Sequence, residues 1–92
     1  MRPNYYIVLV TTASRKNVED ILSEFDKLKV FDKIFAQEDV SKMKPDPEGY
    51  LKAMQYFNIN PEDTIIFEDS EAGLEAAKLS GAYYCKVFKF ND

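Results

Sequence analysis

The sequence predicts an α/β fold with a mostly parallel sheet of about four strands. Short runs of β-branched and aromatic residues alternate along the chain with segments of helical apolar spacing. Cap residues, prolines and glycines separate these segments. The 92 residues are enough for one domain at most, so residues 1–92 are expected to form a single unit with a modest core. Strands that alternate with helices imply right-handed β-α-β crossovers.

The first half of the chain contains two of the predicted strands. Residues 5–10, "YYIVLV", form a continuous apolar run that is typical of a strand covered on both faces. Ser14 is placed to cap the helix that follows. Apolar residues recur in that helix at three- and four-residue spacing and form one stripe: Val18, Ile21, Leu22, Phe25 and Leu28. A short second strand is predicted over residues 33–37, "KIFAQ".

A second helix is expected after the "KMKPDP" segment. Pro45 biases Lys44 towards an extended backbone, Asp46 is a good N-cap residue, and Pro47 suits a first helical turn. The helix should therefore start near Pro47 and run to about Phe57.

Two further strands flank a third predicted helix. The run "TIIF" at residues 64–67 is the third strand, and "AYYCKVF" at residues 82–88 is the fourth. Ser70 should cap a helix over residues 71–79, and Gly81 can end it.

Composition excludes several classes of protein. The chain is 46% hydrophobic and 30% charged with a net charge of -4, which indicates a globular protein with a solvated surface. It contains no Lys/Arg run that would attract nucleic acid or an anionic membrane. Its first residues lack the long apolar core of a signal peptide or a membrane span. A cytoplasmic protein is expected.

The chain has no histidine and one cysteine. Ser-His-Asp, Cys-His and zinc sites are therefore excluded within it. Cys85 cannot form an internal disulfide, and its place in an apolar run predicts a buried strand thiol without a chemical role. What remains is carboxylate, lysine and hydroxyl chemistry, which suits phosphate and Mg²⁺.

Polar residues gather after three of the predicted strands. "TTAS" follows the first strand, "KMKPDP" follows the second, and "EDS" follows the third. The carboxyl ends of parallel strands form the ligand-binding edge of such sheets, so these residues are expected on one edge. Each segment also has a simpler interpretation when taken alone: a helix cap, a solvated lysine, or a carboxylate that faces solvent.

Three segments resemble a known family. "IVLVTTASRKNVEDIL", "FDKIFAQEDVSKMKPDPEGYLKAM" and "PEDTIIFEDSEAGLEAAKLSGAYYCKV" are similar to the second, third and fourth motifs of the haloacid dehalogenase superfamily. The resemblance is closest to its β-phosphoglucomutase-like phosphatases and covers residues 5–87. "KPDP" followed by "FEDSEAG" is a specific pair. The resemblance implies a partial Rossmann-like, haloacid dehalogenase-like three-layer fold that lacks its central first strand.

The resemblance also implies roles for individual residues in binding phosphate. Thr12 and the backbone amide of Ala13 would hold the phosphate, with Thr11 as the alternative to Thr12. Lys44 would neutralise both the phosphate and the attacking carboxylate, as the catalytic and phosphate-binding lysine.

A metal site is implied at the end of the third strand. Asp69 would help to hold Mg²⁺, and Glu68 would support the site from beside it. A metal ion would turn the repulsion between these neighbouring carboxylates into a shared attraction. Phosphoryl transfer then needs mostly positioning and charge neutralisation.

The sequence departs from the family in one respect. Family members carry an Asp-x-Asp motif after their first strand, and its first aspartate attacks phosphorus. No two aspartates of this chain are two residues apart. The nucleophile, the first strand and the substrate-selecting cap are therefore expected to be missing. Mg²⁺ binding should be weak or absent without that segment, and the unpaired strand edges should recruit a second copy or a complementary N-terminal segment.

Two functions from different classes remain open. The chain is either the C-terminal portion of a Mg²⁺-dependent phosphohydrolase for small phosphorylated metabolites, inactive in isolation, or a non-catalytic phosphate- or protein-binding domain with a relic site. A phospho-receiver domain is excluded by residue order, because receivers place their acidic residues first and their lysine last. Without a cap domain the sequence does not identify the substrate.

Overall fold

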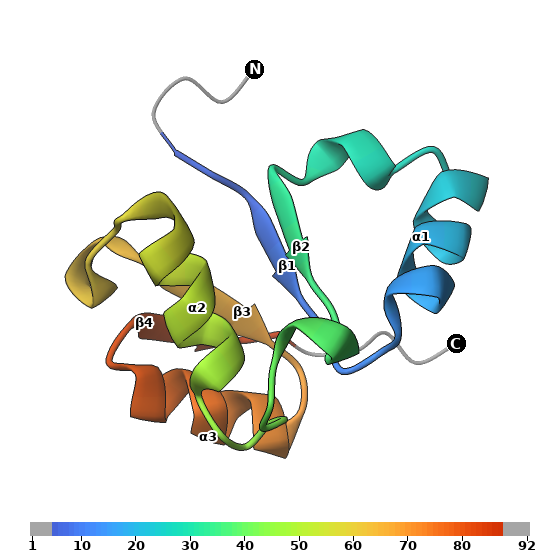
Figure 1. Ribbon diagram of the computed structural model, residues 1–92. Helices are drawn as coiled ribbons and strands as arrows, with labels where there is room; N and C mark the ends of the chain where they lie inside the picture. Colours follow the sequence, from blue (N-terminus) through green and yellow to red (C-terminus); the bar gives the residue numbers. More distant parts are fainter. Residues whose placement is uncertain (1–4, 88–92) are drawn as a thin grey trace. The chain divides into compact units, whose positions relative to one another are not determined.

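The computed structural model describes residues 5–87, apart from the side chain of Leu28. The chain forms two compact units, residues 1–41 and residues 42–92, and each is described by itself (Figure 1). The expected alternation of strands and helices is present in both units. Strands β1 and β2 pair in one sheet and strands β3 and β4 in another, and both pairs are parallel. The predicted α/β class and parallel pairing are therefore confirmed.

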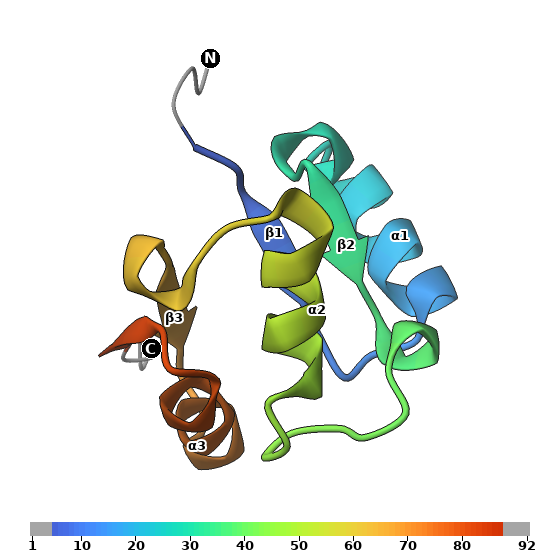
Figure 2. The same cartoon turned by 60° about the vertical axis from the view of Figure 1, so that its left-hand side comes forward.

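The first unit is a β-α-β element with two short 3₁₀ turns. Strand β1 (Val8–Val10) leads into helix α1 (Arg15–Glu24), and strand β2 (Lys33–Phe35) lies beside β1 in both ribbon views (Figure 2). The 3₁₀ turns η1 (Leu28–Val30) and η2 (Gln37–Asp39) flank β2. Both strands are shorter than predicted.

Helix α1 begins as predicted, but little of its apolar stripe is buried. The Ser14 side chain accepts a hydrogen bond from the Asn17 amide, which confirms the cap. Val18 is buried, whereas the side chains of Ile21 and Phe25 are 55% and 66% exposed. Because β1 and β2 contribute only three residues each, their sheet offers too little apolar surface to cover the whole stripe.

Arg15 connects the start of α1 to β2 and to the residues that follow it. Its guanidinium donates to the Ile34 carbonyl at 2.9 Å and to the Asp39 carboxylate. The same carboxylate accepts from the Ala36 amide at 2.8 Å, and the Arg15 amide donates to Glu38 Oε1 at 2.9 Å. The hydrogen bond from the Ala36 amide and the pairing with Arg15 lower the pKa of Asp39, and they outweigh the opposing effect of burial.

We expect Asp39→Asn to destabilise the protein near neutral pH. A folded-state pKa below the unfolded value means that this carboxylate stabilises the fold above about pH 4 and loses that effect as the pH falls through the folded pKa. The loss should be about 1–2 kcal/mol near neutral pH and much smaller at about pH 3, measured by urea unfolding. Asp20→Asn is the matched control, since Asp20 pairs with Lys16 on the surface. Equal effects of the two variants at both pH values would contradict this account.

The second unit contains two helices and the second strand pair. Helix α2 (Glu48–Phe57) leads through the 3₁₀ turn η3 (Pro61–Asp63) to strand β3 (Ile65–Glu68). Helix α3 (Glu71–Ser80) then connects β3 to its parallel partner β4 (Tyr83–Lys86). Helix α3 packs against both strands, and α2 packs against α3.

The ends of α2 and α3 follow the expected cap chemistry with one shift. The Ser70 hydroxyl accepts from the Gly73 amide, and Gly81 ends α3 with a φ of 86°. Asn58 ends α2 in the same left-handed region. The N-cap of α2 is Pro47 rather than Asp46, so the helix begins one residue later than predicted, although the Asp46 carboxylate still accepts from the Glu48 amide at 2.9 Å.

The core of the second unit lies between α2, α3 and one face of β3. Half of its buried apolar residues are alanines: Tyr50, Met54, Ile66, Ala76, Ala77 and Ala82. The alanines allow α3 to approach its neighbours closely. Replacing one of these alanines by a larger residue would therefore disturb the packing of the whole core of this unit.

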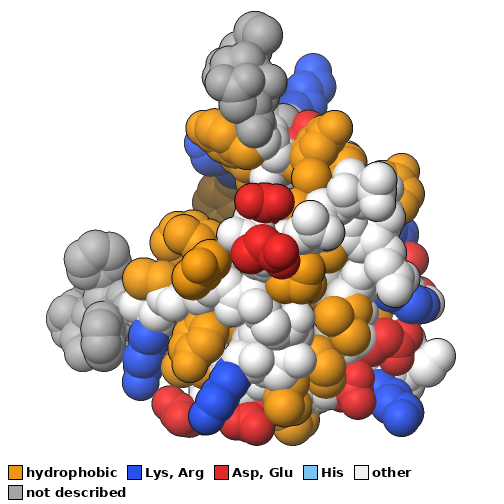
Figure 3. Space-filling view, turned by 90° about the vertical axis from the view of Figure 1, so that its left-hand side faces the viewer, with side chains coloured by type: hydrophobic (Ala, Val, Ile, Leu, Met, Phe, Trp, Pro, Cys, Tyr) orange, Lys and Arg blue, Asp and Glu red, His pale blue; other side chains and the backbone are white. Residues whose placement is uncertain are grey.

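The other face of the β3–β4 sheet is apolar and open to solvent. Ile65 pairs with Tyr83 and Phe67 pairs with Cys85, and their side chains share this face. Ile65, Phe67 and Tyr83 are 60%, 66% and 64% exposed. Figure 3 shows hydrophobic side chains at the surface on the side that it depicts. We call the four residues Ile65, Phe67, Tyr83 and Cys85 the open sheet face.

Cys85 corrects one of our predictions. Its apolar surroundings in the sequence predicted a buried thiol, but the residue is exposed. The reason is its position on the open sheet face, which no described helix covers. Among residues 5–87, no helix is long and apolar enough to cross a membrane.

Candidate functional site

Three side chains of the second unit meet at the end of β3. The Lys44 ammonium lies 2.7 Å from Glu68 Oε2, and the Tyr50 hydroxyl donates a hydrogen bond to the same oxygen. Lys44 Nζ also lies 5.2 Å from the centroid of the Tyr50 ring, within the range of a cation–π interaction. The structure therefore brings together Lys44 and Glu68, both predicted as site residues. Tyr50 of α2 joins them through its hydroxyl.

The second carboxylate oxygen of Glu68 is engaged as well. Glu68 Oε1 accepts from the Asp69 amide at 3.1 Å and from the Ser70 hydroxyl at 3.4 Å. Only 10% of the Glu68 side chain and 16% of the Lys44 side chain are exposed. Glu68 therefore does not face solvent, which was the simpler interpretation of this residue.

These contacts shift the pKa values of Glu68 and Tyr50. Burial opposes ionisation of Glu68, but the hydrogen bonds from Lys44 and Tyr50 and the charge of Lys44 outweigh it and lower the pKa of the carboxyl. Burial, followed by the hydrogen bond to Glu68, raises the pKa of Tyr50 far above its ordinary value. The cluster is thus a carboxylate held between an ammonium and a neutral phenol.

Gly73 leaves the space that Glu68 occupies. A Cβ built on Gly73 would overlap the Cδ, Cγ and Oε2 atoms of Glu68. Because Gly73 lies inside α3, where glycine is unfavourable by about 1 kcal/mol relative to alanine, its presence there is explained by this close approach.

Thr12 and Ala13, the predicted phosphate-binding residues, belong to the first unit and follow β1. Thr12 is exposed. The Ala13 amide donates to the Thr11 hydroxyl at 3.2 Å in a local turn. For Ala13 to bind a phosphate, this amide must exchange the hydroxyl of Thr11 for a phosphate oxygen. The phosphate-binding roles of Thr12 and Ala13 stay predictions.

Asp69 is the exposed carboxylate of the predicted metal site. It directly follows β3, while both oxygens of its neighbour Glu68 already accept hydrogen bonds. Within residues 5–87 no group of three or more acidic, histidine or cysteine side chains is arranged to hold a metal ion. Asp69 fits as one oxygen ligand of Mg²⁺, which normally takes one or two carboxylates and completes its shell with water and phosphate.

The sequence pattern did not identify Tyr50 or Gly73 as site residues. Tyr50 fits the apolar spacing of α2, so nothing in the pattern predicts that its hydroxyl would meet a carboxylate. Gly73 did offer a sign, because a glycine inside a helical segment commonly has a packing reason.

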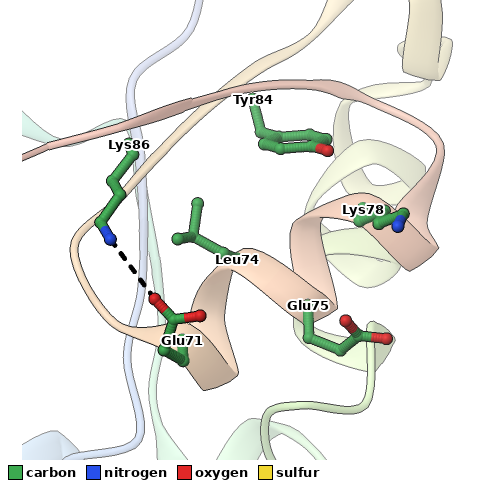
Figure 4. Close-up of a pocket in the computed structure, with 6 residues that line it drawn as sticks. All are labelled: Glu71, Leu74, Glu75, Lys78, Tyr84 and Lys86. Carbon is green, nitrogen blue, oxygen red and sulfur yellow. Dashed lines mark hydrogen bonds and ion pairs between the residues drawn. The ribbon is translucent and has the colours of Figure 1, made fainter.

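A shallow groove lies elsewhere on the second unit, between α3 and β4. It encloses about 340 Å³, and Lys86 pairs with Glu71 across one end at 3.4 Å (Figure 4). It is lined by Glu71, Leu74, Glu75, Lys78, Tyr84 and Lys86. None of the predicted site residues lines it, so the groove is distinct from the cluster around Lys44.

Comparison with known proteins identifies the family of the chain. Residues 2–87 match the model of the haloacid dehalogenase-like hydrolase family. The chain is 40% identical over 75 residues to validoxylamine A 7'-phosphate phosphatase of Streptomyces hygroscopicus subsp. limoneus, covering 82% of this chain and 35% of that protein. It is 36% identical over 88 residues to a phosphorylated carbohydrates phosphatase of Thermotoga maritima, covering 94% and 41%.

Solved structures show the same relationship. CbbY from Rhodobacter sphaeroides in complex with phosphate is 33% identical, with a TM-score of 0.87 over 97% of this chain and 41% of that one. The chain thus spans about two fifths of the length of the relatives that it matches, or less. It belongs to the haloacid dehalogenase-like hydrolase family, and its similarity is to the β-phosphoglucomutase-like phosphatases of that family.

Proposed function

We propose that these 92 residues are the C-terminal portion of a Mg²⁺-dependent phosphohydrolase for small phosphorylated metabolites, and that they are inactive alone. The observation that carries this proposal is the Lys44–Glu68 ion pair at the end of β3, directly before Asp69. Such an ammonium is suited to neutralise a phosphate. Family membership and the phosphatase names of two relatives support the same function.

The chain's own residues would bind and neutralise the substrate. Thr12 and the Ala13 amide would donate hydrogen bonds to the phosphate oxygens, and Lys44 would offset their charge. Asp69 would hold a Mg²⁺ ion, which would supply further positive charge when bound. Positioning and charge neutralisation of this kind account for most of the catalysis of phosphoryl transfer.

The nucleophile would come from a different segment. The chain contains no Asp-x-Asp pair, and Lys44 cannot replace it, because an ammonium paired with Glu68 has no free lone pair. Complementation by a segment that carries a family-type first strand, measured as phosphate release, tests this function. The absence of an Asp-x-Asp motif from these residues is also the observation that favours the second candidate, a non-catalytic phosphate- or protein-binding domain.

The open sheet face supports a further part of the proposal, which is association with another chain. Monomeric proteins rarely expose contiguous apolar surface of this kind, and the free edges of two-stranded sheets add unpaired backbone groups. A complementary N-terminal segment or a second copy of the chain is the proposed partner.

We expect little Mg²⁺ binding to the chain until a phosphate analogue is present. Asp69 supplies one carboxylate, and the oxygens of Glu68 are taken by Lys44, Tyr50 and two further donors. Titration calorimetry should show no measurable heat with MgCl₂ alone and a binding heat once tungstate is added. Tight binding to the unliganded chain that survives Asp69→Asn would contradict the placement of this site.

A further inference from the structure

The position of Lys44 depends on a carboxylate that is itself held in place. Glu68 receives hydrogen bonds at both oxygens, and its side chain lies against α3 where Gly73 has no Cβ. Tyr50 is buried in α2, with 7% of its surface exposed, and its hydroxyl meets the same oxygen that pairs with Lys44. The Glu68 carboxylate is therefore positioned by one residue of α2, which precedes it in the sequence, and by one residue of α3, which follows it.

We propose that Tyr50 and Gly73 are positioning residues, which hold the Glu68 carboxylate so that it fixes Lys44. Tyr50 acts by donation from its hydroxyl, and Gly73 acts by leaving the volume that the carboxylate fills. This inference deepens the proposed function, because it concerns how the proposed phosphate-neutralising lysine is held.

The chemistry of the cluster explains why both residues are needed. A carboxylate that is largely removed from water requires several hydrogen-bond donors, and Lys44 supplies a donor on one side of it only. A tyrosine hydroxyl can donate its proton, and in the structure the Tyr50 hydroxyl donates to the same oxygen that pairs with Lys44. A methyl group at position 73 would force the carboxylate away, even with Tyr50 and Lys44 unchanged.

The inference predicts a specific gain in the reactivity of the Lys44 amine. Acylation of the 92-residue chain with an acetyl ester, followed by mass spectrometry, gives the rate at Lys44 relative to the more exposed Lys52. Tyr50→Phe should raise that relative rate about tenfold, the change expected for loss of one hydrogen bond to a charged group. Tyr56→Phe is the matched control, since it removes a hydroxyl from an exposed tyrosine of the same helix and should change nothing.

A double variant separates positioning from general loosening of the helix. In a Glu68→Gln background the fixing carboxylate is gone, so Tyr50→Phe should add no further increase at Lys44. Hydrogen exchange at the buried Met54 of α2 should stay unchanged in Tyr50→Phe. Gly73→Ala should raise the Lys44 rate as much as Glu68→Gln does.

The contradicting results are equally definite. The inference is wrong if Tyr50→Phe leaves the Lys44 rate unchanged, or if its effect persists in full without Glu68. Because Gly73→Ala could unfold α3, the Tyr50 variants decide the outcome independently. The labelling needs no turnover, so a chain that shows no activity after complementation would contradict the proposed function and leave this result intact.

Discussion

Lys44→Met should destabilise the second unit by about 2–3 kcal/mol, a large share of the stability of a domain of this size. The variant keeps the length of the side chain but leaves the Glu68 carboxylate without its cation, in a place where 10% of that side chain is exposed. Urea unfolding followed by circular dichroism measures the loss. The penalty should shrink in acid, because a protonated Glu68 no longer requires a cation.

The double variant Lys44→Met/Glu68→Gln should recover most of this loss. Removing both charges leaves a neutral amide that can still accept from Tyr50, and replacement of a buried pair is often nearly neutral. The cycle of single and double variants gives the coupling energy of the pair. If the loss of unfolding free energy in the double variant equals the sum of the losses in the two single variants, Lys44 and Glu68 do not stabilise each other.

The order of the elements could be predicted because their ends are marked by residues with local backbone effects. Ser14 and Ser70 cap their helices, and Gly81 adopts the left-handed conformation that stops α3. These effects depend on a few neighbouring residues, so a single sequence reveals them. The strand pattern placed the Lys44 and Glu68 segments on one edge of the sheet and the family motifs gave both residues a role, but neither predicted their direct ion pair.

The burial of individual side chains depends on what packs against each helix or strand, and the sequence pattern predicted it wrongly in several places. Cys85 lies in an apolar run that resembles a buried strand, but its face of β4 has no covering helix among the described residues. Ile21 and Phe25 follow helical spacing and are still exposed. The hydrogen bond between Tyr50 and Glu68 joins residues 18 apart in the sequence, one in α2 and one at the end of β3, so its geometry depends on tertiary packing.

Complementation should produce the largest effect of all. Alone, the 92-residue chain should release no phosphate from an aryl phosphate, because the proposal gives Thr12, Lys44 and Asp69 the roles of binding and neutralising a phosphate, and these residues contain no Asp-x-Asp pair to attack it. Addition of a segment with a family-type first strand and its Asp-x-Asp motif, in trans or by fusion, should restore Mg²⁺-dependent turnover.

Variants of the complemented protein identify the residues that contribute. Asp69→Asn should reduce turnover by a factor of about 10²–10³ or more, as for removal of one transition-state contact. Asp69 is exposed, so this change should lower the free energy of unfolding less than changes at Lys44 do. Lys44→Ala should also abolish turnover, and the stability cycle above separates its catalytic effect from unfolding.

Phosphate release by the highly purified chain, with and without the added segment, is the measurement that tests the central claim most directly. The account predicts no release by the chain alone, and release with the segment that requires Mg²⁺ and disappears on Asp69→Asn. Activity of the unsupplemented chain that disappears on Asp69→Asn would contradict the account, since it would mean that a residue of these 92 serves as the nucleophile.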